Sequence, residues 1–154
     1  VVERIKGQHR RAFMIFLDID GLKSVNDGLG HKVGDAFIRE MADVIKASVP
    51  KDCLVMRYGG DEFILFLSNS NKNNCTTLIN SIYEELYMKY GFKSEISALL
   101  GRDVSIPEDR LLSFSTGIID LSSNKNLNIS ELVEIADKAM YKAKKNGKSC
   151  YIFS

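Results

Sequence analysis

The sequence carries almost no net charge and no long apolar segment. Its 154 residues hold 21 lysines and arginines against 20 aspartates and glutamates, for a formal net charge of +1. No sequence-wide field therefore draws the chain toward nucleic acid or an anionic membrane. No apolar run approaches the roughly 20 residues that a membrane-spanning helix needs, and no signal-peptide pattern is visible. We expect a domain that contacts neither nucleic acid nor membrane directly.

Cysteine is also scarce. The chain has three cysteines, an odd number, and they are widely spaced without a C-x-x-C pair; they are Cys53, Cys75 and Cys150. This pattern indicates neither a disulfide framework nor a zinc site, and it suits a reducing cytoplasm. The apolar fraction of 45% and the charged fraction of 27% are ordinary for a globular protein. The length predicts one domain that buries its own core.

Hydrophobic patterning predicts a mixed sheet with helices packed on it. The expected strands span residues 12–20, 53–58, 63–68, 111–121 and 150–153. The first is apolar almost throughout, which is typical of a strand buried on both faces. The second and third form a hairpin through the turn 59–62.

Three amphipathic helices separate these strands. Two are expected over 35–49 and 75–91, and a third follows a Ser130 cap and ends at Gly147. Residues 21–35 predict a short helix and a loop, and 92–110 is a polar excursion without a predicted element. The order is strand, helix, hairpin, helix, strand, helix, strand, which predicts the α/β (α+β) class with a mixed β-sheet flanked by helices.

Acidic residues end the first strand and occupy the hairpin turn. Asp18 and Asp20 belong to the strand, and Asp61 and Glu62 to the turn. If the strands are neighbours, up to four carboxylates converge. Two bare carboxylates 4 Å apart repel by about 4 kcal/mol at an effective dielectric near 20, so such a cluster indicates a bound cation. Oxygen-only ligands favour Mg²⁺ or Mn²⁺, and Mg²⁺ often also binds substrate phosphates.

Each feature alone also has a plainer interpretation. Gly-Gly-Asp-Glu is a common composition for a polar hairpin turn, and Asp18 and Asp20 are also explained as solvated strand-end residues. The lysines near the C-terminus are equally explained as solvating a helix end; they are Lys142, Lys144, Lys145 and Lys148.

Three separated motifs together resemble the GGDEF domains of diguanylate cyclases. They are FLDIDGLKSVNDGLGHKVGD, RYGGDEF and ADKAMYKAKKNGK, in the family's order from about Ala12 to Phe153. The resemblance implies a palm-like fold similar to class III nucleotidyl cyclase catalytic domains. It implies condensation of two GTP into cyclic di-GMP and two pyrophosphates, with Mg²⁺ (or Mn²⁺), across a transient antiparallel homodimer that carries one GTP per domain.

The resemblance also implies a domain organisation. Residues 1–154 would form a single GGDEF domain that lacks the family's leading motif, with a sensor or anchor expected upstream. The domain would be cytoplasmic, whether or not a membrane sensor tethers it in the full-length protein.

The motifs imply a role for each site residue. The metal ligands are Asp18, the Ile19 carbonyl, Asp61 and Glu62, and either Asp61 or Glu62 takes the proton from the attacking 3′-hydroxyl. The phosphate ligands are Lys23, Lys144 and Lys148, with Lys23 also in the catalytic set. Asn26 and Asp35 read guanine, and His31 has a weaker role at the nucleotide. A carboxylate accepts both the N1–H and the N2 amino group of guanine, so Asp35 should select GTP over ATP.

Two departures from the family pattern carry expectations. Pro50 and Cys53 stand where an inhibitory product site has arginine and aspartate, so we expect no product inhibition there. Lys148 stands where an arginine is common and offers a point charge instead of a fork. Two alternatives remain: a catalytically weak GTP-binding regulatory module, and a polymerase-like palm or ATP-using cyclase, against which Asp35 argues.

Overall fold

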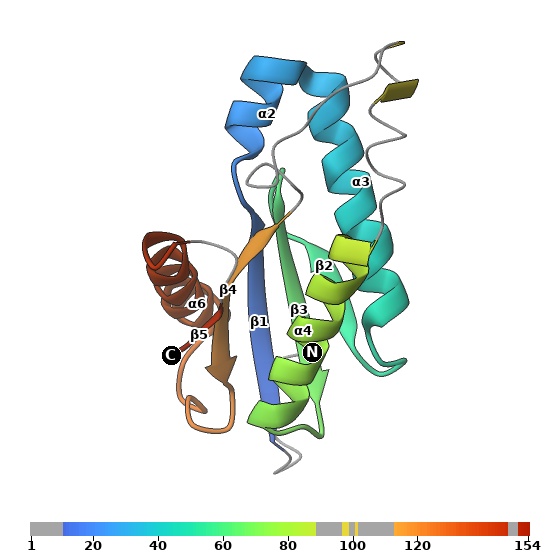
Figure 1. Ribbon diagram of the computed structural model, residues 1–154. Helices are drawn as coiled ribbons and strands as arrows, with labels where there is room; N and C mark the ends of the chain where they lie inside the picture. Colours follow the sequence, from blue (N-terminus) through green and yellow to red (C-terminus); the bar gives the residue numbers. More distant parts are fainter. Residues whose placement is uncertain (1–10, 89–96, 99–100, 102–112, 148–150) are drawn as a thin grey trace.

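A five-stranded sheet forms the centre of the domain, with helices on both faces (Figure 1). The computed structural model describes residues 11–88, 97–98, 101, 113–147 and 151–154. The strands are β1 (Ala12–Ile19), β2 (Leu54–Arg57), β3 (Glu62–Ser68), β4 (Phe114–Asp120) and β5 (Tyr151–Phe153). The helices are α2 (Leu22–Leu29), α3 (His31–Ser48), α4 (Lys72–Met88) and α6 (Ile129–Lys145). The predicted mixed sheet flanked by helices is confirmed.

The strand order β2-β3-β1-β4-β5 puts the first strand in the middle of the sheet. All neighbouring strands are antiparallel except β4 and β5, which run parallel. The hairpin of β2 and β3 therefore lies beside β1, as the clustering of acids requires.

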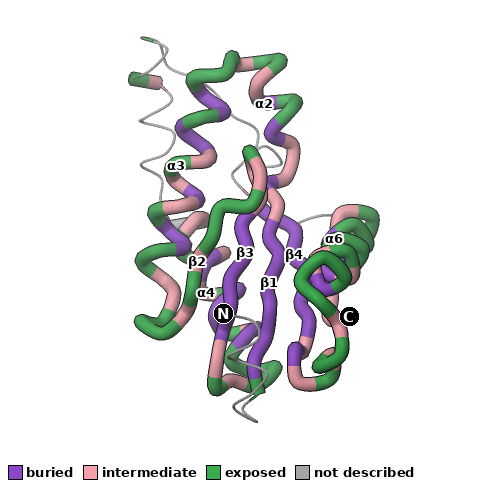
Figure 2. The backbone as a smooth tube through the Cα atoms, turned by 180° about the vertical axis from the view of Figure 1, so that it is seen from behind, coloured by how far each residue is buried: buried purple, intermediate pink, exposed green. Residues whose placement is uncertain are grey.

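Side chains of β1 alternate between two cores, one on each face of the sheet. Phe13, Ile15 and Leu17 belong to the core that includes residues of α3 and α4, whereas Met14 and Phe16 belong to the core under α6. Figure 2 shows β1, β3 and β4 buried along most of their length. Burial on both faces explains why the run over 12–20 is almost continuously apolar.

The loop expected after the short helix is absent. α3 begins at His31, so the segment 31–34 is helical. Gly30 has φ +93°, which a residue with a side chain rarely adopts, and its N–H donates to the Asn26 carbonyl at the end of α2. One glycine thus connects the two helices, and the predicted loop over these residues is wrong.

The N-cap of α6 also differs from the prediction. Asn128 caps the helix: its side chain accepts from the Glu131 N–H at 3.0 Å, and the Glu131 carboxylate accepts from the Asn128 N–H at 2.8 Å. This reciprocal capping box satisfies two N–H groups that would otherwise lack partners. Ser130 lies within the first turn, so its prediction as the cap is wrong.

Some predictions fall outside the described residues. These are most of the polar excursion over 92–110, the start of the strand expected over 111–121, Lys148 and Cys150. Within the described part of the chain, no helix has the length and apolar character needed to cross a membrane.

Candidate active site

The C-terminal end of β1 meets the hairpin turn on one side and β4 on the other. Asp18 lies opposite Glu62 of β3 and opposite Ser115 of β4. The Ile19 N–H donates to the Asp61 carbonyl at 3.1 Å, which ties the end of β1 to the turn. The predicted proximity of the first strand to the acidic turn is therefore observed.

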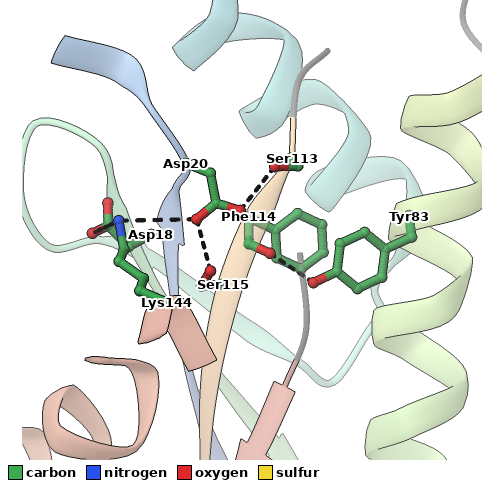
Figure 3. Close-up of polar contacts among 7 residues, drawn as sticks. All are labelled: Asp18, Asp20, Tyr83, Ser113, Phe114, Ser115 and Lys144. Atoms are coloured by element: carbon green, nitrogen blue, oxygen red, sulfur yellow. Dashed lines mark hydrogen bonds and ion pairs between the residues drawn. The ribbon is translucent and has the colours of Figure 1, made fainter. Parts of the chain in front are cut away.

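Lys144 brings positive charge from α6 to this point (Figure 3). Its Nζ lies 2.8 Å from Asp18 Oδ2 and 4.0 Å from Asp20 Oδ1. The lysine side chain is 25% exposed and the Asp18 side chain 13%, so the pair is largely shielded from solvent. Solvation of a helix end does not describe Lys144, which points into the site.

Gly117 on β4 allows α6 to approach closely enough for this contact. A Cβ at this position would lie 2.2 Å from the Ala136 carbonyl oxygen and 2.7 Å from the Met140 nitrogen. Both atoms are helix backbone and cannot move independently of α6. The missing side chain therefore sets the distance between the helix and the sheet.

Asp20 accepts hydrogen bonds from two serines, Ser113 just before β4 and Ser115 within it. Its carboxylate accepts from Ser113 Oγ at 2.8 Å and from Ser115 Oγ at 2.7 Å. The start of β4 is held in turn by Tyr83, which stacks on Phe114 and donates to the Phe114 carbonyl at 2.6 Å (Figure 3). Serine hydroxyls therefore already bind the oxygens of Asp20, which lies within 4.0 Å of the same lysine that pairs with Asp18.

Asp18 has a different environment. Its Oδ1 is buried and has no hydrogen-bond partner among the described residues, while Oδ2 pairs with Lys144. Burial raises the pKa of Asp18 to about 6; the charge and hydrogen bond of Asp61 raise it further, and Lys144 opposes the shift. The buried carboxylate thus has an oxygen available for a further positive partner.

These surroundings fit a divalent cation. No three His, Cys, Asp or Glu side chains form a metal cluster within the described ranges. Mg²⁺ does not need such a cage, because it usually takes one or two carboxylates together with water and substrate phosphates. Two carboxylates are present here: Asp18, which has an oxygen without a partner among the described residues, and Asp61 beside it.

Glu62 lies at the start of β3, folded back over the turn. A Cβ on Gly59 would lie 2.6 Å from Glu62 Oε2, so a side chain there would displace the carboxylate from this position. Burial raises the pKa of Glu62, and the charges of Asp61 and of Asp137 on α6 add to the shift. Asp61 and Asp137 therefore favour protonation of Glu62 or its pairing with a cation, whereas the charge of Lys144 opposes the shift.

Arg57 holds the turn from within the RYGGDEF motif. Its Nε donates to the Gly59 carbonyl at 3.2 Å and its Nη2 to the Gly60 carbonyl at 2.6 Å. The sequence analysis assigned Arg57 no role, nor did it assign one to Ser113 or Ser115. The sequence does not single out Ser115, because β4 also contains Thr116, which is equally buried, and Asp120.

Four other residues predicted to bind the nucleotide lie on a different part of the fold. Lys23 and Asn26 are on α2, and His31 and Asp35 are in the first turns of α3. Asn26 is half-buried, and the other three are exposed. α2 follows the end of β1 after two residues, so this group is connected directly to the acidic end of the strand.

Comparisons with known proteins agree with this architecture. The family model described as "Diguanylate cyclase, GGDEF domain" matches residues 1–150. A bifunctional diguanylate cyclase/cyclic di-GMP phosphodiesterase, MucR of Pseudomonas aeruginosa, is 34% identical over 144 residues, which are 94% of this chain and 19% of MucR. This chain thus spans about a fifth of that relative.

Solved structures show the same likeness. An EAL/GGDEF domain protein from M. capsulatus has a TM-score of 0.74 at 31% identity, over 97% of this chain and 91% of that one. The GGDEF domain of DgcB from Caulobacter crescentus, solved in complex with c-di-GMP, has a TM-score of 0.73 at 22% identity, over 99% and 85% of the two chains. The chain belongs to the GGDEF-domain family of diguanylate cyclases.

Proposed function

We propose that this domain condenses two molecules of GTP into cyclic di-GMP with release of two pyrophosphates, in a transient antiparallel pair of domains. The observation that carries the proposal is the largely buried Asp18 carboxylate, which has one oxygen without a partner among the described residues, a raised pKa and Asp61 beside it. DgcB, a fold neighbour, was solved with c-di-GMP, which is consistent with this product class.

Asp18, the Ile19 carbonyl, Asp61 and Glu62 are the proposed ligands of Mg²⁺ or Mn²⁺. The cation, when bound, supplies charge neutralisation for the phosphates. Lys144 would then leave its ion pair with Asp18 and bind the triphosphate. Lys23 and Lys148 would contribute further positive charge. Asn26 and Asp35 hold guanine, and His31 lies beside the nucleotide.

The reaction joins groups from two domains. The 3′-hydroxyl of one GTP attacks the α-phosphorus of the other, the bond to pyrophosphate breaks, and Asp61 or Glu62 accepts the hydroxyl proton. Two such steps close the ring. A monomer holds one GTP and therefore half of the reactants, so turnover requires two domains.

The test is incubation of the domain with GTP and Mg²⁺ and detection of the cyclic dinucleotide by mass spectrometry. We expect product, at a rate that grows faster than linearly with protein concentration because two domains must meet. GTP that binds in the presence of Ca²⁺ but yields no product with Mg²⁺ at high protein concentration would contradict the proposal.

A second candidate is a regulatory module that binds GTP with little turnover. The 2.8 Å ion pair between Lys144 and Asp18 Oδ2 favours it, because the lysine already neutralises Asp18 and so weakens the attraction of this carboxylate for a cation. The same incubation separates the two candidates. If the Lys144→Ala variant turned GTP over faster than wild type, the ion pair would be what restrains turnover, and the regulatory module would be favoured.

A further inference from the structure

The side chain of Asn26 on α2 rests on the backbone of α3 at Gly34. A Cβ at Gly34 would lie 1.7 Å from Asn26 Oδ1, 2.8 Å from its Cγ and 3.3 Å from its Nδ2. The oxygen is thus the atom turned toward α3. Gly34 has no positive φ and is helical, so the backbone does not require glycine there. The Asn26 carboxamide, in its observed position, is what leaves no room for a Cβ at Gly34.

The position of this carboxamide gives nothing to folding. Asn26 Oδ1 is buried and has no hydrogen-bond partner among the residues that the structure describes. A buried acceptor without a donor costs free energy, and replacing it with an apolar group is often neutral or stabilising. A residue held in this way at a cost to stability is expected to serve binding.

We propose that Gly34 is a positioning residue for base selectivity, which acts through Asn26. Its missing side chain lets the amide oxygen turn toward α3, which leaves the amide nitrogen, the carboxamide atom farther from Gly34, to contact the base together with the carboxylate of Asp35, the next residue along the helix. This inference rests on the proposed GTP site.

The pair then matches one edge of guanine. Asn26 Nδ2 donates and the Asp35 carboxylate accepts, whereas guanine presents an acceptor, O6, beside two donors, N1–H and the N2 amino group. Adenine presents the opposite pattern at the corresponding positions, with a donor at N6 and an acceptor at N1. A Cβ on Gly34 would displace the carboxamide and remove the donor that distinguishes the two bases.

The experiment compares Gly34→Ala, Asn26→Ala, their double variant and wild type. Each is titrated calorimetrically with GTP and with ATP, using Ca²⁺ in place of Mg²⁺. We expect Gly34→Ala to weaken GTP binding roughly tenfold, the value of one hydrogen bond to a base, and to leave ATP binding unchanged. Asn26→Ala should do the same, and the double variant should lose no more than either single variant.

Gly28→Ala is the matched control, because Gly28 is also helical, on α2, and a Cβ there meets nothing within 4 Å. It should keep the wild-type ratio of GTP to ATP affinity. A general disturbance of the site would weaken both nucleotides equally. The inference is overturned if Gly34→Ala keeps the wild-type ratio, or if its effect persists undiminished in the Asn26→Ala background.

Thermal unfolding covers the case in which Gly34→Ala folds poorly. Asn26→Ala removes the obstructing atoms, so the double variant should regain most of the melting temperature that Gly34→Ala loses. No recovery would overturn the steric coupling. Failure of wild type to bind GTP would refute the proposed function and the selectivity role with it, whereas this recovery tests the contact independently.

Discussion

Two regions of the candidate site are organised by different forces. At the end of β1, an ion pair and hydrogen bonds hold the side chains: Lys144 pairs with Asp18 at 2.8 Å, and Asp20 accepts from two serines. Between α2 and α3, shape alone holds Asn26 against Gly34. The charged region has a cation of its own, Lys144, in place before any ligand binds, whereas the α2–α3 region leaves a buried oxygen without a donor in the part of the chain that the structure describes.

This difference suggests what each region must do on binding. In the charged region Lys144 must leave the Asp18 carboxylate to bind the phosphates of the nucleotide, so binding there reorganises existing contacts. In the α2–α3 region, Asn26 Oδ1 has no hydrogen bond to any described residue that would have to break. We therefore expect substitutions in the charged region to change turnover and stability together, and those between α2 and α3 to change selectivity.

The largest expected effect follows from Asp18→Asn. Loss of a metal-binding carboxylate should reduce turnover by at least about 100-fold, because charge neutralisation at a phosphoryl group contributes several kcal/mol. The matched control is Asp20→Asn, whose side-chain oxygen still accepts from serine and which should lose less than about tenfold. Initial rates of cyclic dinucleotide formation measure both, and equal losses would contradict the different roles of the two residues.

The same residue predicts a pH dependence of folding. The pKa of Asp18 is raised from 3.8 to about 6, so between these values the folded state binds more protons than the unfolded state. The contribution of this proton to the free energy of unfolding is fully present below about pH 4. It is lost as pH rises through about 6, which lowers the free energy of unfolding by up to about 3 kcal/mol. Above pH 6 the ionised carboxylate therefore destabilises the metal-free fold.

Urea unfolding of wild type and Asp18→Asn without metal, from pH 4 to pH 8, measures this effect. The stability of wild type relative to the variant should fall across the interval, because the variant has no proton to lose. A constant difference between the two proteins would show that the pKa of Asp18 is not raised in the folded state.

The sheet and most of its helices were predictable because their signals are local. A continuous apolar run identified the central strand, and two glycines between apolar runs identified the hairpin. The start of α3 was not predictable from composition, since Gly30, His31 and Gly34 suggest a loop. One glycine at positive φ and one that receives a neighbouring side chain explain them instead.

The site was predictable as a set of residues and less so as a set of contacts. Asp18, Asp61 and Lys144 do lie together, as the motifs implied. The partners of Asp20 lie within and just before β4, more than 90 residues along the chain, and sequence spacing carries no information on the register that brings them there. The reach of Lys144 likewise depends on how closely α6 packs at Gly117.

Gly117→Ala tests that dependence and should destabilise the fold by about 2 kcal/mol, as overpacking of a core usually does. The added methyl meets the backbone of α6, so the helix must move away from β4 and carry Lys144 from Asp18. GTP affinity should fall with stability. Chemical denaturation and a GTP titration with Ca²⁺ measure the two changes, with Gly28→Ala again as the control; lowered stability with unchanged GTP affinity would show that the position of α6 does not govern Lys144.

The smallest expected effect concerns the other end of α6. Asn128→Ala removes the capping box and should cost about 1 kcal/mol, whereas Ser130→Ala should cost little because Ser130 makes no cap. Lys144 lies four turns away, and loss of a cap frays mainly the first turn. Asn128→Ala should therefore lower the melting temperature without changing GTP affinity in the presence of Ca²⁺. A matching loss of affinity would indicate that α6 moves as one rigid body. The position of Lys144 near Asp18 would then depend on the whole helix and not on its last turn alone.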